Sequence, residues 1–286
     1  KGLDRLMEIF LNGEFLSEEE ACISPFDRGF MYGDGAFETL RVYDGKAFLL
    51  EKHLGRLAHS LDGLWIKDPY SFEEWYKYSK ELIVRNGLAD CILRIQVTRG
   101  VGKRGYGSFG TDTYTSLMSI HEAPPLAGPE TQLSLITATG TVSDHDPLST
   151  MKTTNKLVNI VAMREAETAG ADDAILLNRE GHVTETTSSN LFAFVNGALR
   201  TPPVSSGCLS GITRGLILEL ATELGISCTQ SDLPHEQFAT CEGAFLTNSI
   251  RQVQSVGSLD GKNLPENERT QKFKQAYSER VTSTTT

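Results

Sequence analysis

The sequence has little positive charge and no long apolar run. It carries 27 Lys and Arg against 37 Asp and Glu, which gives a net charge of −10 at neutral pH. This acidic balance argues against nucleic acid or an anionic membrane as the main partner. No apolar run approaches the roughly 20 residues of a membrane span, and no basic-then-apolar leader is recognisable. We therefore expect a cytoplasmic protein that binds neither nucleic acid nor membrane.

The cysteines also lack any pairing pattern. There are five of them, an odd number, and none forms a CxxC motif; they are Cys22, Cys91, Cys208, Cys228 and Cys241. The sequence therefore predicts neither a disulfide framework nor a metal site, and this usage fits a reducing compartment. A length of 286 residues with 39% hydrophobic content suggests one large domain or two ordinary ones with real cores.

A segment dense in proline and glycine, residues 123–129, interrupts the chain. Such composition is typical of a linker. We therefore predict a smaller N-terminal α+β domain at residues 7–122, a linker at 123–130, and a larger C-terminal domain at 131–280. The Thr/Ser-rich tail after Arg280 is expected to be ragged.

Turn and periodicity signals predict alternating strands and helices in both parts. In the first part we expect hairpins at 9–16 and 40–50, a helix carrying Leu54, Leu57, Ala58, Leu61 and Leu64, a helix from a Ser71–Glu74 capping box to Gly87, and a strand at 91–98. In the second part we expect strands at 132–139, 173–178, 182–186, 191–195, 198–201 and 242–247, and helices from about 154 to 169 and after Gly211.

Lys152 and Glu185 have the most informative chemistry. Lys152 lies just before a predicted helix, and a lysine there can form a Schiff base with an aldehyde. Glu185 lies on a predicted strand, where a carboxylate can keep a pyridine nitrogen protonated. These are the two groups that pyridoxal phosphate needs from a protein. Either residue alone is more often a solvated surface group, so the prediction depends on its surroundings.

A phosphate-bearing cofactor also needs backbone N–H groups at a helix start and an arginine. Residues 209–214 open a helix with a hydroxyl and a glycine, although an ordinary capped helix would look the same. Residues 247–249 end a strand with three polar side chains, which would suit a phosphate or a simple polar turn. Arg56 flanks the apolar stripe of its helix and could equally snorkel to solvent.

Residues 100–105 match the G-x-G-x-x-G pattern and follow a predicted strand. A dinucleotide fingerprint must then open a helix, but residues 106–111 are unsuited to one. We therefore predict a mobile glycine-rich loop that presents Arg104 to an anionic substrate, rather than a nucleotide site.

The order of these motifs resembles the class IV aminotransferase family of pyridoxal-phosphate enzymes, also called fold type IV. The resemblance runs from about residue 9 to 277 and rests on residues 27–30, 32–41, 53–57, 152–155, 165–166, 183–185, 189–192, 211–214 and 246–249. It implies an α/β fold of two domains with the cofactor in the interdomain cleft. It also implies at least a homodimer, in which a partner loop helps to close each site.

The resemblance assigns roles by position. Lys152 matches the Schiff-base lysine and Glu185 the partner of the pyridine nitrogen. Together with the local reasoning above, the expected phosphate contacts are Arg56, Gly211, Ile212, Thr213, Asn248 and Ser249. The expected contacts to a small, anionic, amino-acid-like substrate are Phe37, Thr39, Arg104 and Tyr106.

The subfamily motifs are mixed. Branched-chain enzymes usually have glycine where Thr39 stands and tyrosine where Lys156 stands. D-amino acid aminotransferases resemble residues 98–100 and share an arginine like Arg104. Aminodeoxychorismate lyases resemble residues 99–106 closely and have a threonine like Thr39.

These motifs favour 4-amino-4-deoxychorismate lyase, which releases pyruvate and 4-aminobenzoate. Lys152 would be its base, and Thr39 would help to deliver a proton to the leaving group. The alternative is a D-amino acid or branched-chain transaminase, in which Lys152 returns the proton to the cofactor. A non-catalytic cofactor carrier is a third possibility from another class; it would need the phosphate contacts but not Lys152, Glu185 and Arg104 together.

Overall fold

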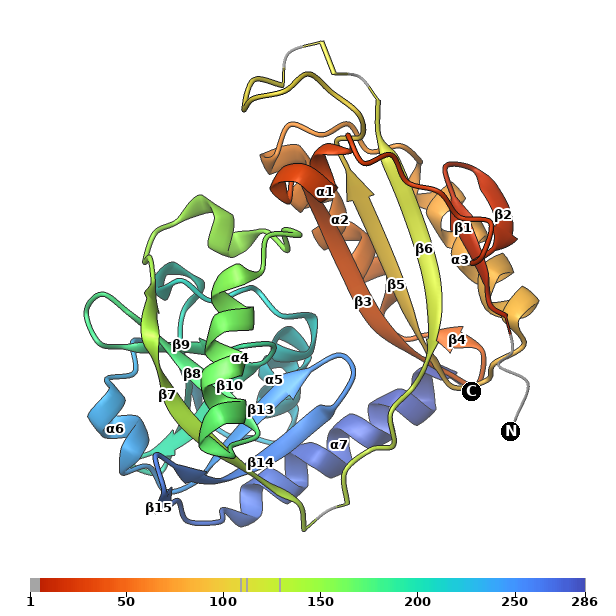
Figure 1. Ribbon diagram of the computed structural model, residues 1–286. Coiled ribbons are helices and arrows are strands. Elements are labelled where there is room, and N and C mark those ends of the chain that lie inside the picture. The colour runs from red at the N-terminus through yellow and green to blue at the C-terminus, as the bar shows by residue number, and fades with distance from the viewer. Residues whose placement is uncertain (1–5, 109, 112, 129, 286) are drawn as a thin grey trace. The chain divides into compact units, whose positions relative to one another are not determined.

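The computed structural model describes residues 6–108, 110–111, 113–128 and 130–285, and the chain forms two compact units (Figure 1). Unit 1 contains Lys1–Pro124 and also the short segment Met151–Asn155. Unit 2 contains Pro125–Thr150 and Lys156–Thr284. Within the described ranges, no helix has the length and apolar character to cross a membrane.

Unit 1 is built on a six-stranded sheet in the order β2-β1-β6-β5-β3-β4, in which all neighbours are antiparallel. Its strands are β1 (Glu8–Leu11), β2 (Glu14–Ser17), β3 (Gly35–Tyr43), β4 (Lys46–Ala47), β5 (Cys91–Thr98) and β6 (Thr115–Glu122).

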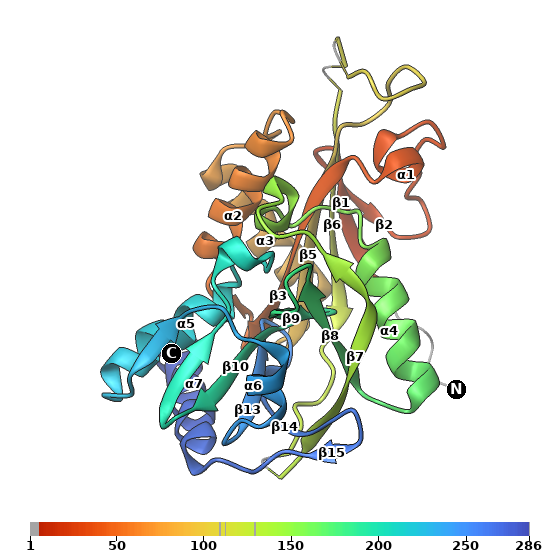
Figure 2. The ribbon, with the colours of Figure 1, turned by 90° about the vertical axis from the view of Figure 1, so that its left-hand side faces the viewer.

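Two helices cover one face of this sheet: α2 (Leu50–Gly63) contacts β3, and α3 (Phe72–Asn86) contacts β1 and β6 (Figures 1 and 2). Successive strand side chains point to opposite faces, so Leu40, Leu93 and Ile95 join the helices in the core. The alternate residues of β3, Phe37 and Thr39, are only half-buried and lie on the other face. The short helix α1 (Arg28–Tyr32) precedes β3.

Most local signals in unit 1 are confirmed. The 9–16 hairpin, the 91–98 strand and the Ser71–Glu74 capping box are present, and Gly87 ends α3 in a left-handed conformation. The second arm of the predicted 40–50 hairpin is wrong: β4 has two residues, because Leu49 adopts φ 55° and turns the chain into α2. On α2, Ala58 is exposed rather than packed, and Leu64 lies beyond the last turn.

Unit 2 has a nine-stranded sheet in the order β12-β11-β10-β13-β14-β7-β8-β9, with β15 paired to β14. Three neighbouring pairs are parallel, β11–β12, β14–β7 and β7–β8, and the rest are antiparallel. The strands are β7 (Gln132–Val142), β8 (Asp173–Asn178), β9 (Val183–Thr186), β10 (Asn190–Val195), β11 (Ala198–Thr201), β12 (Cys228–Gln230), β13 (Ala244–Asn248), β14 (Gln252–Leu259) and β15 (Lys262–Asn263).

The helices of unit 2 pack along this sheet (Figure 1). They are α4 (Leu157–Ala169), α5 (Ile212–Glu223), α6 (His235–Ala239) and α7 (Glu268–Thr285), with 3-10 turns at Pro147–Thr150 and Val204–Ser206. Phe273 of α7 packs against Phe245, which stacks on Phe192 at 5.0 Å between ring centroids. The mixed α/β fold predicted from the sequence is confirmed.

The expectation of a ragged tail after Arg280 is wrong, because α7 continues to Thr285. Val281 is buried, and Arg280 pairs with Glu223 of α5 at 2.7 Å. The Thr284 hydroxyl donates to the Arg280 carbonyl at 2.8 Å, which ties the last turn to the one before it. Packing and local bonds therefore outweigh the weak helix preference of a Thr/Ser-rich segment.

Candidate active site

Lys152 lies in an extended segment rather than at a helix start. Its carbonyl accepts a hydrogen bond from the Phe37 N–H at 2.9 Å, and the Thr154 N–H donates to the Gly35 carbonyl, also at 2.9 Å. These bonds tie the segment to β3 and hold it out of helical geometry. For this reason α4 begins at Leu157, and the predicted start near residue 154 is wrong.

Helix α2 fixes Lys152 from a second direction. The Lys152 N–H donates to the Ser60 hydroxyl at 3.0 Å, and that hydroxyl donates to the Arg56 carbonyl at 2.9 Å. The ammonium nitrogen lies over the Phe37 ring, 4.7 Å from its centroid. The lysine backbone is therefore held by both a strand and a helix, while its half-buried side chain contacts Phe37, on the sheet face opposite α2 and α3.

A second cation, Arg94 of β5, contacts the same Phe37 ring, with its guanidinium carbon 4.2 Å from the centroid. Arg94 also donates to the Gln96 side chain at 2.8 Å and makes a long contact of 3.4 Å to the Thr39 hydroxyl. Burial lowers the pKa of Arg94, and no described carboxylate pairs with it. A half-buried arginine beside an amine suits a substrate carboxylate.

Sequence reasoning missed Arg94, although a signal was present. In β5 the residues Cys91, Leu93 and Ile95 are buried, while Arg94 and Gln96 alternate with them and are half-buried. This alternation indicates a strand with one polar face. What the sequence lacked was the pairing of Arg94 with Thr39 across β3 and β5.

The side chain of Arg56 is only 9% exposed and bonds to Glu38 rather than reaching solvent, so the snorkelling interpretation is wrong. Its Nε and Nη2 atoms donate to the two carboxylate oxygens of Glu38, each at 2.7 Å. His53 Nδ1 lies 2.6 Å from Glu38 Oε2. Burial raises the pKa of Glu38, but the hydrogen bonds and charges of Arg56 and His53 outweigh it and hold the value at about 2. The ionised Glu38 carboxylate therefore holds the Arg56 guanidinium in one orientation.

The glycine-rich loop after β5 opens no helix in its described residues, so it lacks the helix start that a dinucleotide fingerprint requires. Arg104 and Tyr106 are exposed, Tyr106 at 90%. Among the contacts of the described residues, none joins Arg104 or Tyr106 to Phe37, Thr39 or Lys152. The structure thus places these two predicted substrate residues together on the loop, and the other two together on the sheet.

In unit 2, Glu185 lies on β9 and accepts a hydrogen bond from the Leu209 N–H at 3.0 Å. The threonines on either side pin the strand: Thr184 donates to the Leu176 carbonyl and Thr186 to the Asp173 carboxylate. Burial, and after it the charge of Glu185, raise the pKa of Cys208 to about 12. The Glu185 carboxylate is therefore fixed in position, as the partner of a protonated pyridine nitrogen must be.

The start of α5 suits a phosphate. Gly211 occupies the N-cap position, and no side chain caps the helix there. A Cβ at Gly211 would collide with the side chain of Asn190, which donates to the Leu209 carbonyl at 2.8 Å. The hydroxyls of Thr213 and Ser249 lie 3.5 Å apart. A helix start with N–H groups and two hydroxyls is a ready anion site.

The side chain of Asn248 bonds to neighbouring groups of the protein. Its amide oxygen accepts the N–H groups of Ile250 and Arg251 at 3.0 and 2.7 Å, and its amide nitrogen donates to the Ser189 hydroxyl at 2.9 Å. The side chain therefore shapes the turn that follows β13. This turn carries Ser249, so the two sequence interpretations of residues 247–249, phosphate contact and polar turn, are compatible.

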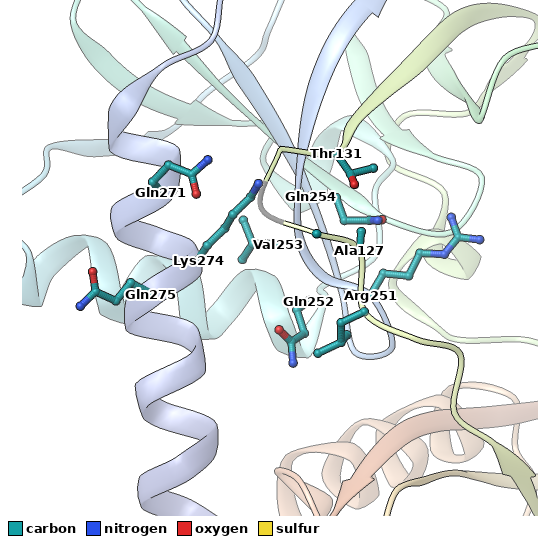
Figure 3. Close-up of a pocket in the computed structure, with 11 residues that line it drawn as sticks. Ala127, Thr131, Arg251, Gln252, Val253, Gln254, Gln271, Lys274 and Gln275 are labelled. Atoms are coloured by element: carbon teal, nitrogen blue, oxygen red, sulfur yellow. The ribbon is translucent and has the colours of Figure 1, made fainter.

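A cavity of about 370 Å³ lies elsewhere in unit 2, between α7, β14, residues 126–128 and Thr131 (Figure 3). None of the predicted site residues lines it. Arg251 and Lys274 are the cations that line it. Burial lowers the pKa of the Lys274 ammonium, and the nearby charges of Glu266 and Glu130 oppose that effect.

Each unit carries six of the twelve predicted site residues. Unit 1 carries Phe37, Thr39, Arg56, Arg104, Tyr106 and Lys152, and unit 2 carries Glu185, Gly211, Ile212, Thr213, Asn248 and Ser249. The donor set fits pyridoxal phosphate: an amine on a rigid backbone, a fixed carboxylate and an uncapped helix start.

Comparison with known proteins gives the family. The model of the class IV amino-transferase family matches residues 35–259. A protein of Methanocaldococcus jannaschii with the provisional name branched-chain-amino-acid aminotransferase is 37% identical over 275 residues, 95% of each chain. The aminodeoxychorismate lyase of Bacillus subtilis is 30% identical over 249 residues, 86% of this chain and 84% of that protein.

A solved structure agrees. The branched-chain aminotransferase of Thermoproteus uzoniensis, crystallised with norvaline, superposes with a TM-score of 0.90 at 27% identity and covers 97% of this chain and 95% of its own. The predictions of an enzyme and of its family are confirmed, and the family is one that depends on pyridoxal phosphate. The chain belongs to the class IV aminotransferase family.

Proposed function

We propose that this chain is a pyridoxal-phosphate-dependent transaminase that moves the amino group of an amino acid to a 2-keto acid. The observation that carries the proposal is the pair of cations on Phe37: Lys152 at 4.7 Å and Arg94 at 4.2 Å from the ring centroid. An α-amino acid presents an amine and a carboxylate on one carbon. An arginine with no described carboxylate partner beside the reactive lysine suits such a substrate.

Two residues of the loop motif that favoured the lyase, Arg99 and Gly100, do not discriminate between the two reactions. Arg99 pairs with Asp34 and donates to the Leu64 and Trp65 carbonyls, so it is a structural residue. Gly100 has φ 76°, and a Cβ there would lie 3.0 Å from the backbone of Tyr114. These residues are explained by how the loop is built, without reference to a substrate.

Each residue of the proposed site then has one task. When bound, pyridoxal phosphate supplies an aldehyde that takes up the amino group and a ring that accepts electrons from the substrate's α-carbon. Lys152 would hold the aldehyde, and its freed amine would take the α-carbon proton and later return one. Glu185 would keep the ring nitrogen protonated, and Arg94 would bind the substrate carboxylate.

The phosphate would lie at the start of α5. The backbone N–H groups of Ile212 and Thr213, the Ser249 hydroxyl and the guanidinium of Arg56 are the proposed donors. Glu38 keeps Arg56 in one orientation through two hydrogen bonds of 2.7 Å, which reduces the entropy that phosphate binding would cost.

Product analysis tests the proposal. The purified protein with added pyridoxal phosphate is incubated with panels of L- and D-amino acids and 2-oxoglutarate or pyruvate, and separately with aminodeoxychorismate. We expect a keto acid and a new amino acid from at least one pair. Formation of 4-aminobenzoate with no keto acid transfer would reject the transaminase in favour of the lyase.

The lyase is a second candidate because of Thr39. Its hydroxyl lies on the same sheet face as Phe37 and, from the residues that the structure describes, receives one long contact, from Arg94 at 3.4 Å. A lyase needs a proton for its leaving group, and simple transamination has no such step. Thr39→Val should then lower 4-aminobenzoate formation by about 10²-fold and affect transamination of alanine much less. Equal losses in both reactions would exclude a lyase role for Thr39.

We also propose a homodimer. Large apolar side chains are exposed around α1, with Phe30 at 78% and Phe26 at 61%, and contiguous exposed apolar surface is typical of an interface. Light scattering should give twice the 31.4 kDa chain mass. Phe30→Asp should shift the protein to monomer, whereas Phe72→Asp on α3, also an exposed phenylalanine, should not. A monomeric wild type would refute this proposal.

A further inference from the structure

Arg28 opens α1 and is buried, with only 4% of its side chain exposed. Its Nε atom donates to the Asp34 carboxylate at 2.8 Å. This ion pair occupies the Nε edge of the guanidinium. The other N–H groups point to the glycine-rich loop between β5 and β6.

Four carbonyl groups of that loop lie around the Arg28 guanidinium. Nη1 donates to the Gly105 carbonyl at 2.8 Å and has longer contacts with those of Lys103 and Gly107, at 3.3 and 3.4 Å. Nη2 donates to the Tyr106 carbonyl at 3.3 Å. A guanidinium holds its five N–H donors in one rigid plane. Backbone carbonyls that accept hydrogen bonds from these donors are therefore held in a fixed arrangement.

Tyr32 holds the loop from a neighbouring position on α1. Its hydroxyl accepts the Gly105 N–H at 3.1 Å, and its ring lies 5.8 Å from that of Tyr106. The Arg28 guanidinium in turn lies over the Tyr32 ring at 5.0 Å. Gly102 completes the fit, because a Cβ there would approach the Arg28 side chain to 2.9 Å.

We propose that Arg28 is a positioning residue: it gathers the backbone carbonyls of residues 103 and 105–107 and so presents Arg104 and Tyr106 for recognition of a carboxylate-bearing substrate. The backbone oxygens face inward to one buried cation, while both of these side chains are exposed. The substrate part of this inference rests on the proposed function. The ordering of the loop does not, and it can be measured without substrate.

Arg99 provides a matched control for the ion pair itself. It also binds Asp34, with Nε at 2.8 Å and Nη2 at 3.0 Å, but its remaining donors go to the Leu64 and Trp65 carbonyls. Loss of Arg28 and loss of Arg99 each remove one partner of Asp34. Only the loss of Arg28 removes the donors of the 103–107 loop.

Limited trypsin digestion of the holoenzyme tests the ordering, because Lys103 and Arg104 are both exposed cleavage sites in this loop. In Arg28→Lys, a single ammonium cannot serve Asp34 and four carbonyls together. Cleavage after residues 103 and 104 should therefore be at least about tenfold faster than in the wild type. Arg99→Lys should cleave there at close to the wild-type rate.

Tyr32→Phe keeps the ring and every buried charge, and removes only the hydroxyl that accepts the Gly105 N–H. It should raise cleavage in the same direction by a smaller factor, and it serves as the test if Arg28→Lys does not fold. Unchanged loop cleavage in both variants, or equal acceleration in Arg99→Lys, would overturn the inference.

Kinetics test the recognition step. Arg104→Ala should raise KM for the best amino acid by about tenfold, and Arg28→Lys should raise it similarly with little change in kcat. The double variant should be no worse than the more impaired single variant, since both changes remove one contact. Fully additive losses would show that Arg28 acts elsewhere. A protein without transaminase activity would refute the proposed function, whereas the digestion result would still decide the role of Arg28.

Discussion

Glu38→Gln should destabilise unit 1 strongly, because Glu38 pairs with two buried basic groups at once. Its carboxylate is fully buried and receives Arg56 twice and His53 once, at 2.6 to 2.7 Å. Glutamine keeps the size but turns one oxygen into a donor that faces other donors. Removing one partner of a buried ion pair costs about 3–5 kcal/mol, and we expect a loss of this size at pH 7.

The pH dependence of the free energy of unfolding gives a second, independent estimate of the Glu38 contribution. The pKa of Glu38 falls from 4.5 to about 2 because the Arg56 and His53 interactions overcome burial, so its contribution to stability is complete above pH 4.5 and is lost as pH falls toward 2. Burial lowers the pKa of His53, so its contribution is present above pH 6.5 and also declines in acid. One pKa unit corresponds to about 1.4 kcal/mol. The gap between wild type and Glu38→Gln should therefore shrink by roughly 2 kcal/mol between pH 5 and pH 3.

Tryptophan fluorescence in urea measures this effect in unit 1, because the two tryptophans of the chain, Trp65 and Trp75, both lie there. Trp75 is 1% exposed, so its emission should shift when the core opens. Glu14→Gln, at an exposed position of β2, is the matched control and should change stability by less than about 0.5 kcal/mol. A loss under about 1 kcal/mol for Glu38→Gln, or a gap that does not change with pH, would refute the reasoning.

Three further outcomes follow from the site. Borohydride reduction of the holoenzyme, digestion and mass spectrometry should place the pyridoxyl group on Lys152; finding it on Lys156 would reject the assignment. Glu185→Gln should retain the cofactor but lower turnover by at least about 10²-fold, or ~2.7 kcal/mol of barrier, and near wild-type turnover would exclude the counter-ion role. Arg94→Lys should raise KM for amino acids by about tenfold, because an ammonium loses the paired donors of a guanidinium; an unchanged KM would remove Arg94 from the substrate site.

The elements that could be predicted from sequence are those fixed by short-range bonds. The Ser71 hydroxyl accepts the Glu74 N–H and the Glu74 carboxylate accepts the Ser71 N–H, so four consecutive residues contain the whole signal. The hairpin at Asn12-Gly13 needs only two residues with positive φ, at 52° and 99°. Such signals can be recognised in a single sequence because the bonds that form these elements join residues close together in the chain.

The unpredicted parts depend on contacts between distant residues. Lys152 belongs to unit 1 because its segment bonds to β3, more than a hundred positions earlier, and no periodicity in residues 151–156 announces that pairing. Arg94 meets Thr39 only through the register of β5 on β3, a separation of 55 residues. In both cases the local sequence is compatible with several structures, and the sheet selects one of them.

The residues that can separate a lyase from a transaminase are therefore not Arg99, Gly100 and Gly102, the structural residues of the glycine-rich loop. That loop is shaped by Arg28 and by backbone geometry at Gly100 and Gly102, which any substrate would leave unchanged. The half-buried face of β3 and β5 is different, because Thr39 and Arg94 contact each other beside Phe37, and Arg94 has no carboxylate partner among the described residues. We expect a half-buried arginine at this position to bind the carboxylate of a substrate, because a guanidinium can pair with a carboxylate through two parallel hydrogen bonds.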